Sequence, residues 1–145
     1  DQSGLYATRL ALAAPADHVV LPEIISKEPL GPAVRQGDDK WYDIVKWVHY
    51  GLLTAEELGI TQANVDEMKT STNPEILRVL GMEADTKLGT DMGLDNDWLA
   101  KAVKAVGNYG EVFERNVGQG SALKIARGLN AQWSKGGLQY APPIR

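Results

Sequence analysis

Residues 107–118 read Gly107-Asn108-Tyr109-Gly110-Glu111-Val112-Phe113-Glu114-Arg115-Asn116-Val117-Gly118. The glycines at 107 and 110 predict a turn into a short helix that carries Val112 and Phe113. The chain then closes with Trp133-Ser134-Lys135-Gly136-Gly137-Leu138-Gln139-Tyr140-Ala141-Pro142-Pro143-Ile144-Arg145. Neither stretch pairs a nucleophile with a base, so neither indicates catalysis. The prolines of the second stretch are expected to hold the tail extended.

Composition places the chain among globular proteins. It has 145 residues, of which 43% are hydrophobic and 23% charged, enough for one ordinary core. The net charge of −4 provides no attraction to nucleic acid, and no basic run indicates a membrane surface. The chain has no cysteine, which excludes disulfides, thiolate metal sites and cysteine nucleophiles. Its apolar stretches are far shorter than the ~20 residues that span a bilayer.

Capping signals and periodicity predict a mostly helical chain with little strand. We expect Ser3 to cap a helix over residues 4–14, and residues 17–22 to form a short strand that Pro22 ends. The strongest helix should open at residues 37–39. Its apolar face combines side chains at helical spacing, namely Trp41, Ile44, Val45, Val48 and Leu52.

Further helices are expected along the rest of the chain. Residues 54–57 have the form of a capping box for an additional turn, which Gly59 would end. A short helix is expected at residues 64–69, another between Asn73-Pro74 and Gly81, and a polar loop over residues 83–94. Asp95 should open a helix with Leu99, Ala102, Val103 and Val106 on one face, and Ser121 should cap a last helix that runs to about Ser134.

No metal or catalytic residue is predicted. The two histidines, His18 and His49, are far apart in sequence and lack metal-ligand spacing. The acidic pairs all stand at expected helix starts, where they oppose the positive end of the helix dipole. These pairs are Asp38/Asp39, Glu56/Glu57 and Asp95/Asp97.

The four tryptophans could form a stacking platform for a base or sugar. Trp41 and Trp98 lie on the apolar faces of their helices, so we interpret them as core residues. Trp47 lies off its helix face near Tyr50, and we expect it to be partly exposed, covering an element outside this chain.

Two further segments stand apart from ordinary core patterning. They read Ile25-Ser26-Lys27-Glu28-Pro29-Leu30-Gly31-Pro32-Ala33-Val34-Arg35 and Gly37-Asp38-Asp39-Lys40-Trp41. Together with residues 107–118 and 133–145, they resemble the C-terminal part of the general L-amino-acid-binding periplasmic proteins that serve ABC importers, in the bacterial extracellular solute-binding protein family 3. The chain begins without Met, and the resemblance suggests that it is a piece of a longer protein.

The resemblance implies an α/β fold class: the C-terminal portion of a two-lobed, type II periplasmic-binding-protein fold that is mostly helical in this part. Residues 1–24 would end the second lobe, residues 25–36 would form a hinge crossing, and residues 37–145 would form the helical C-terminal part of the first lobe. The implied function is capture of polar L-amino acids in the periplasm and delivery to the permease, without catalysis, a cofactor or nucleic acid. A missing N-terminal segment, or a second copy of the chain, would then be a partner.

Asp1 is the one residue for which the resemblance implies a specific ligand-binding role. In the family, an acidic residue between a strand and a helix of the second lobe accepts hydrogen bonds from the ligand α-ammonium, and Asp1 resembles that residue. A carboxylate is needed there because a buried ammonium must be paired. The alternative is a helix-entry residue that precedes a Ser3 cap. Two alternative functions remain for the whole chain. It could be a dehydratase-like enzyme of the same two-lobed fold, or a self-standing helical interaction domain.

Overall fold

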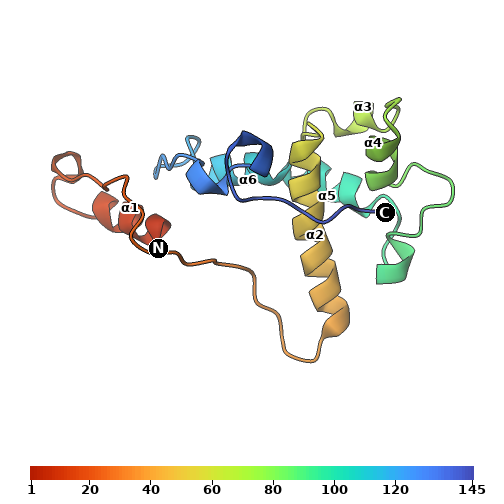
Figure 1. The fold of residues 1–145 in the computed structure, drawn as a ribbon, viewed down its shortest axis with the longest axis horizontal. Helices are drawn as coiled ribbons and strands as arrows, with labels where there is room; N and C mark the ends of the chain where they lie inside the picture. The colour runs from red at the N-terminus through yellow and green to blue at the C-terminus, as the bar shows by residue number, and fades with distance from the viewer. The chain divides into compact units, whose positions relative to one another are not determined.

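The computed structural model describes residues 1–145 as two compact units (Figure 1). Unit 1 consists of residues 1–33 and 113–127, and unit 2 of residues 34–112 and 128–145. The regular structure is helical, and the only β pairing is an isolated parallel bridge between Gln132 and Gln139. None of the helices is both long enough and apolar enough to cross a membrane. The sequence-based division at residues 24 and 36 stays a prediction.

Unit 1 begins with helix α1 (Gln2–Leu10), and its cap differs from the prediction. Asp1, not Ser3, is the N-cap: Asp1 Oδ1 accepts hydrogen bonds from the Gly4 amide and the Ser3 hydroxyl, both at 2.7 Å. The helix therefore starts two residues earlier than expected, and it also ends earlier, at Leu10. The local pattern allowed either residue to cap, because both side chains carry an oxygen acceptor.

The predicted strand at residues 17–22 is wrong. A 3₁₀ turn, η1 (Pro15–Asp17), occupies its start, and His18 follows in an extended conformation with φ −120° and ψ 140°. No segment of the chain pairs with the extended residues, so no ladder of hydrogen bonds forms. A strand exists only with a partner, which local sequence does not reveal.

Helix α6 (Tyr109–Asn116) confirms the short helix expected after Gly107, but the predicted helix from Ser121 to Ser134 is wrong. The chain turns back instead: the Ile125 amide donates to the Val117 carbonyl at 3.0 Å, and the Gln119 amide donates to the Glu114 carboxylate at 2.8 Å. Only two 3₁₀ turns follow, η3 (Gly128–Asn130) and η4 (Trp133–Lys135). Hydrogen bonds back to α6 and to Val117 thus replace the expected helical pattern in this segment.

Unit 2 is organised around helix α2 (Asp39–Glu57), which packs against α5 (Trp98–Val106). Helix α3 (Val65–Met68) packs on α5 in turn, and α4 (Pro74–Val79) completes the unit (Figure 1). The buried residues form one apolar core from all four helices, their loops and the tail. Its members are Ala55, Ile60, Val65, Ile76, Val79, Leu80, Trp98, Leu99, Ala100, Val103 and Ile144.

Several local predictions for unit 2 are confirmed. The Asp38 side chain caps α2 by accepting from the Trp41 amide at 3.1 Å, and Asn73 caps α4 by accepting from the Glu75 amide at 2.9 Å. Pro74 stands at the first turn of α4, as expected. These signals act within one helical turn, so they survive in the folded chain.

Two predictions for α2 are wrong. The capping box at residues 54–57 does not form, because α2 continues through it and the Thr54 hydroxyl donates to the Tyr50 carbonyl at 2.9 Å. Trp41 is not a core residue, since 52% of it is exposed. The first turns of α2 extend beyond the elements that cover its later turns, so an apolar face is exposed there.

The tail of the chain is fixed by its side chains. Gln132 is buried, and its Nε2 donates to the Leu53 carbonyl of α2 at 2.9 Å. Ile144 is buried in the core of unit 2, so the last residues contribute to that core directly. The tail follows the extended course expected from its prolines, without a helix or strand after residue 135 other than the bridge at Gln139.

We predict that the isolated chain self-associates or binds another chain through unit 1. None of the residues of α1 is buried, and Val19 and Leu30 are 76% and 75% exposed. Unpaired extended backbone beside exposed apolar side chains favours pairing with another chain. Sedimentation velocity should show an average mass that rises with concentration, and a Val19→Ser/Leu30→Ser variant should show a smaller rise. A chain that stays monomeric at every concentration would contradict the prediction.

Candidate functional site

One carboxylate oxygen of Asp1 accepts hydrogen bonds within the helix cap, and the other does not. Its Oδ1 is held by the Ser3 hydroxyl and the Gly4 amide, as described above, and Oδ2 makes no hydrogen bond in the structure. The start of α1 therefore fixes the carboxylate and leaves Oδ2 able to accept a hydrogen bond from a cationic group.

The histidines do not form a metal site. His18 Nδ1 lies 2.9 Å from the Ala14 carbonyl, whereas His49 stands edge-on to the Tyr109 ring, with centroids 5.9 Å apart. Partial burial lowers the pKa of His49, because removal from water disfavours the charged ring. No group of three or more acidic or histidine side chains could hold a metal ion.

The acidic pairs have structural partners. Lys101 Nζ lies 2.5 Å from Asp95 and 2.8 Å from Asp97, at the start of α5. The hydrogen bond to Lys101 lowers the pKa of Asp95, and the same bond, with that to Asp97, raises the pKa of Lys101. Glu57 Oε1 accepts from Trp133 Nε1 at 3.0 Å. Asp95, Asp97 and Glu57 are thus used in ion pairs and in a bond to the tail.

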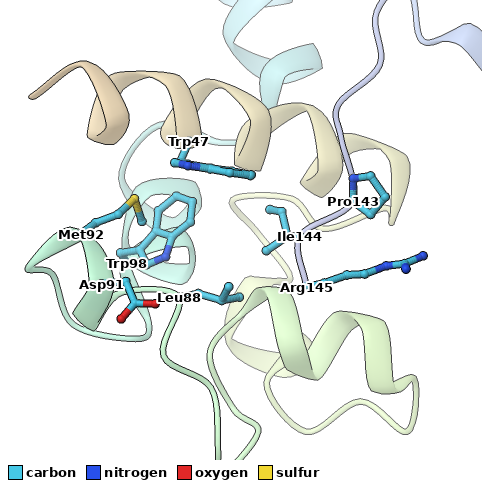
Figure 2. A pocket seen from close by; sticks show the side chains of 8 residues that line it. All are labelled: Trp47, Leu88, Asp91, Met92, Trp98, Pro143, Ile144 and Arg145. Carbon is cyan, nitrogen blue, oxygen red and sulfur yellow. The ribbon is translucent and has the colours of Figure 1, made fainter. Parts of the chain in front are cut away.

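A cavity in unit 2 was not anticipated from the sequence. It has a volume of about 230 Å³ and lies between α2, α5, the loop after α4 and the tail (Figure 2). Its lining consists of Trp47, Leu88, Asp91, Met92, Trp98, Pro143, Ile144 and Arg145. Trp47 is partly exposed, as expected, and it packs against the core of unit 2 and lines this cavity. The residues come from four separate segments, so no spacing in the sequence marks them as a group.

The chain is closely similar to known transport proteins along its whole length. It is 72% identical over 145 residues to "General L-amino acid-binding periplasmic protein AapJ" of Rhizobium johnstonii. It is 59% identical over 146 aligned residues to "Glutamate/glutamine/aspartate/asparagine-binding protein BztA" of Rhodobacter capsulatus. Among solved structures, an ABC transporter periplasmic binding protein from Brucella ovis with glutathione bound matches with a TM-score of 0.94 and 71% identity, over 100% of this chain.

The chain matches the C-terminal part of amino-acid-binding periplasmic proteins. The resemblance inferred from the sequence is thus confirmed, and so is the fold class, a mostly helical portion of a periplasmic-binding-protein fold. The chain spans 42% of the length of AapJ, 43% of BztA and 45% of the Brucella ovis chain. No family model matches the chain.

Proposed function

We propose that this chain acts as the C-terminal part of the solute-binding component of an ABC importer, which captures polar L-amino acids in the periplasm and delivers them to the permease. The observation that carries the proposal is the 72% identity to AapJ over the whole chain. At that level of identity, and with the same fold, the two chains are expected to share their mode of action.

The proposed ligand group at Asp1 is an α-ammonium. Amino acids carry this group, and so does the γ-glutamyl end of glutathione, the compound bound in the Brucella ovis structure. Oδ2 of Asp1 could accept hydrogen bonds from it while Oδ1 stays in the helix cap. A charged acceptor suits an ammonium, because the pair offsets the cost of removing both charges from water.

We further propose that hinge closure, and not covalent chemistry, is the working step. Residues 25–36 would form a hinge crossing, residues 1–24 would end the second lobe, and residues 37–145 would belong to the first lobe. A ligand that contacts both lobes stabilises the closed form by binding it more tightly than the open form. Because the acidic side chains with described partners serve in caps and ion pairs, the structure favours this proposal over a dehydratase-like enzyme. The extent of the match to binding proteins favours it over a self-standing helical domain.

We predict that the 145-residue chain alone binds free L-amino acids weakly or not at all. One carboxylate oxygen is a small part of an amino-acid site, which also needs a partner for the α-carboxylate and walls around the side chain. Calorimetric titration with a panel of L-amino acids should give no measurable heat of binding. Micromolar affinity in a monomer would contradict the prediction and would show a self-contained site.

The direct test of the proposed function joins this chain to the preceding part of AapJ. At 72% identity, the chain should replace its counterpart there with little disturbance of packing. The chimera should bind an L-amino acid that AapJ binds, with an affinity near that of AapJ itself. A folded chimera that binds no amino acid would reject the proposed function.

A further inference from the structure

The tail of unit 2 exposes four large apolar side chains within twelve residues. They are Leu129, Trp133, Leu138 and Tyr140, which are 46%, 58%, 66% and 70% exposed. We call these four residues the tail patch. Single apolar side chains on a surface are ordinary, but several large ones gathered together mark a contact with another surface.

The backbone of the tail patch is ordered by hydrogen bonds. The Leu138 amide donates to the Leu129 carbonyl at 2.8 Å, and the Trp133 amide donates to the Gln139 carbonyl at 2.9 Å. These two bonds join the two ends of the segment and bring the four side chains into one region of the surface. The exposure of the tail patch is therefore a property of a folded segment and not of a loose end.

Two side-chain bonds fix the same segment beside the last turns of α2 (Figure 1). Gln132 is buried and donates to the Leu53 carbonyl, as described above, and Trp133 Nε1 donates to Glu57 Oε1 at 3.0 Å. The indole of Trp133 is thus held in place although more than half of it is exposed. Side chains that are fixed before binding lose little freedom in a contact, which favours a tight one.

The character of the tail patch distinguishes between the surfaces that could cover it. More than half of AapJ's length lies outside the match, and this chain corresponds to the C-terminal part of such proteins. A contact with a permease would have to be released in each transport cycle, and permanent interfaces are more hydrophobic than transient ones. None of the four side chains is charged, so the tail patch suits a permanent contact within one polypeptide.

We propose that the tail patch packs against the part of the protein that corresponds to the preceding portion of AapJ. Its four side chains would then be buried in the complete protein, against apolar side chains of that portion. The inference rests on the proposed function, because it takes the preceding portion to resemble that of AapJ. It concerns a surface apart from the proposed ligand group, since Asp1 belongs to unit 1 and the tail patch to unit 2.

Hydroxyl-radical footprinting of the 145-residue chain and of the AapJ chimera tests the proposal. Mass spectrometry gives the oxidation rate of each aromatic side chain, with the 145-residue chain diluted until it is monomeric. Trp98 is only 7% exposed and provides the rate of a buried indole. Trp133 should react several times faster than Trp98 in the 145-residue chain, and within about twofold of Trp98 in the chimera. Tyr140 should be protected in parallel.

A double variant separates the proposed contact from the folding of the tail. Leu138→Ser/Tyr140→Ser should leave the urea midpoint of the 145-residue chain unchanged, because both side chains are exposed there. In the chimera it should lower the midpoint by about 1 M, since two buried apolar side chains are lost. The matched control, Leu138→Met/Tyr140→Phe, keeps the apolar surface and should change neither midpoint.

The failure of this proposal is distinguishable from the failure of the proposed function. If Trp133 and Tyr140 react as fast in the folded chimera as in the 145-residue chain, the proposal is overturned, whether or not the chimera binds an amino acid. Protection that appears only with a permease or a second copy would assign the tail patch to that partner and overturn it too. If the chimera does not fold, the preceding portion of AapJ is added as a separate chain, and absence of protection then overturns the proposal.

Discussion

Asp1→Asn should weaken amino-acid binding by about thirtyfold to several thousandfold in the AapJ chimera, with almost no change in thermal midpoint. The loss is that of one member of a hydrogen-bonded charge pair in a closed cleft. In the variant the amide oxygen keeps the cap on Gly4, so the amide nitrogen takes the place of Oδ2. A donor would then face the ligand ammonium. Asparagine caps helices about as well as aspartate, so α1 should keep its stability.

Two further variants separate binding from capping. Asp1→Ala removes both functions and should lose a similar factor in affinity, together with about 0.5–2 kcal/mol of stability. Asp38→Ala removes the equivalent cap of α2, where the side chain accepts from Trp41, and should affect stability alone. Calorimetric titration and thermal unfolding measure the two quantities. If Asp1→Asn binds within a few fold of the unmodified chimera, Asp1 is a helix cap and not a ligand group.

Gly81→Ala should destabilise unit 2 by about 2–5 kcal/mol. Gly81 ends α4 with φ +75°, where a side chain costs roughly 1–2 kcal/mol. A Cβ there would also lie 2.1 Å from the Asn96 carbonyl oxygen, so the backbone before α5 would have to move. Asn96 holds the loop between α4 and α5 through its bond to the Thr86 carbonyl at 2.8 Å. Forcing extra atoms into such a contact adds about 1–3 kcal/mol.

Gly59 provides the matched control for this substitution. It ends α2 with φ +70°, but a Cβ there would meet no atom within 4 Å. Gly59→Ala should therefore cost only the conformational part, roughly 1–2 kcal/mol. Urea unfolding of the two variants gives the difference directly. Equal destabilisation would mean that the loop at Asn96 moves aside without cost.

The sequence by itself determined the helices whose signals lie within one turn. Helix α2 opens within residues 37–39 and Asn73 caps α4, both as expected, because a capping side chain bonds an amide only two or three residues away. Trp98 was correctly predicted to be a core residue, since α5 has a continuous apolar face. The quoted segments also predicted the match to periplasmic binding proteins, which the comparison with AapJ confirms.

Only the tertiary structure decided features that depend on distant partners. Trp41 has the same helical spacing as the half-buried Val48 and Leu52, yet it is 52% exposed. The expected helix after Ser121 is replaced by a folded-back segment, and farther along Gln132 makes a buried bond to Leu53, 79 residues away in sequence. The cavity beside Trp98 likewise combines four segments that no local pattern relates. Periodicity reports which side chains can be buried, but burial itself requires a second surface, and the folded chain alone supplies it.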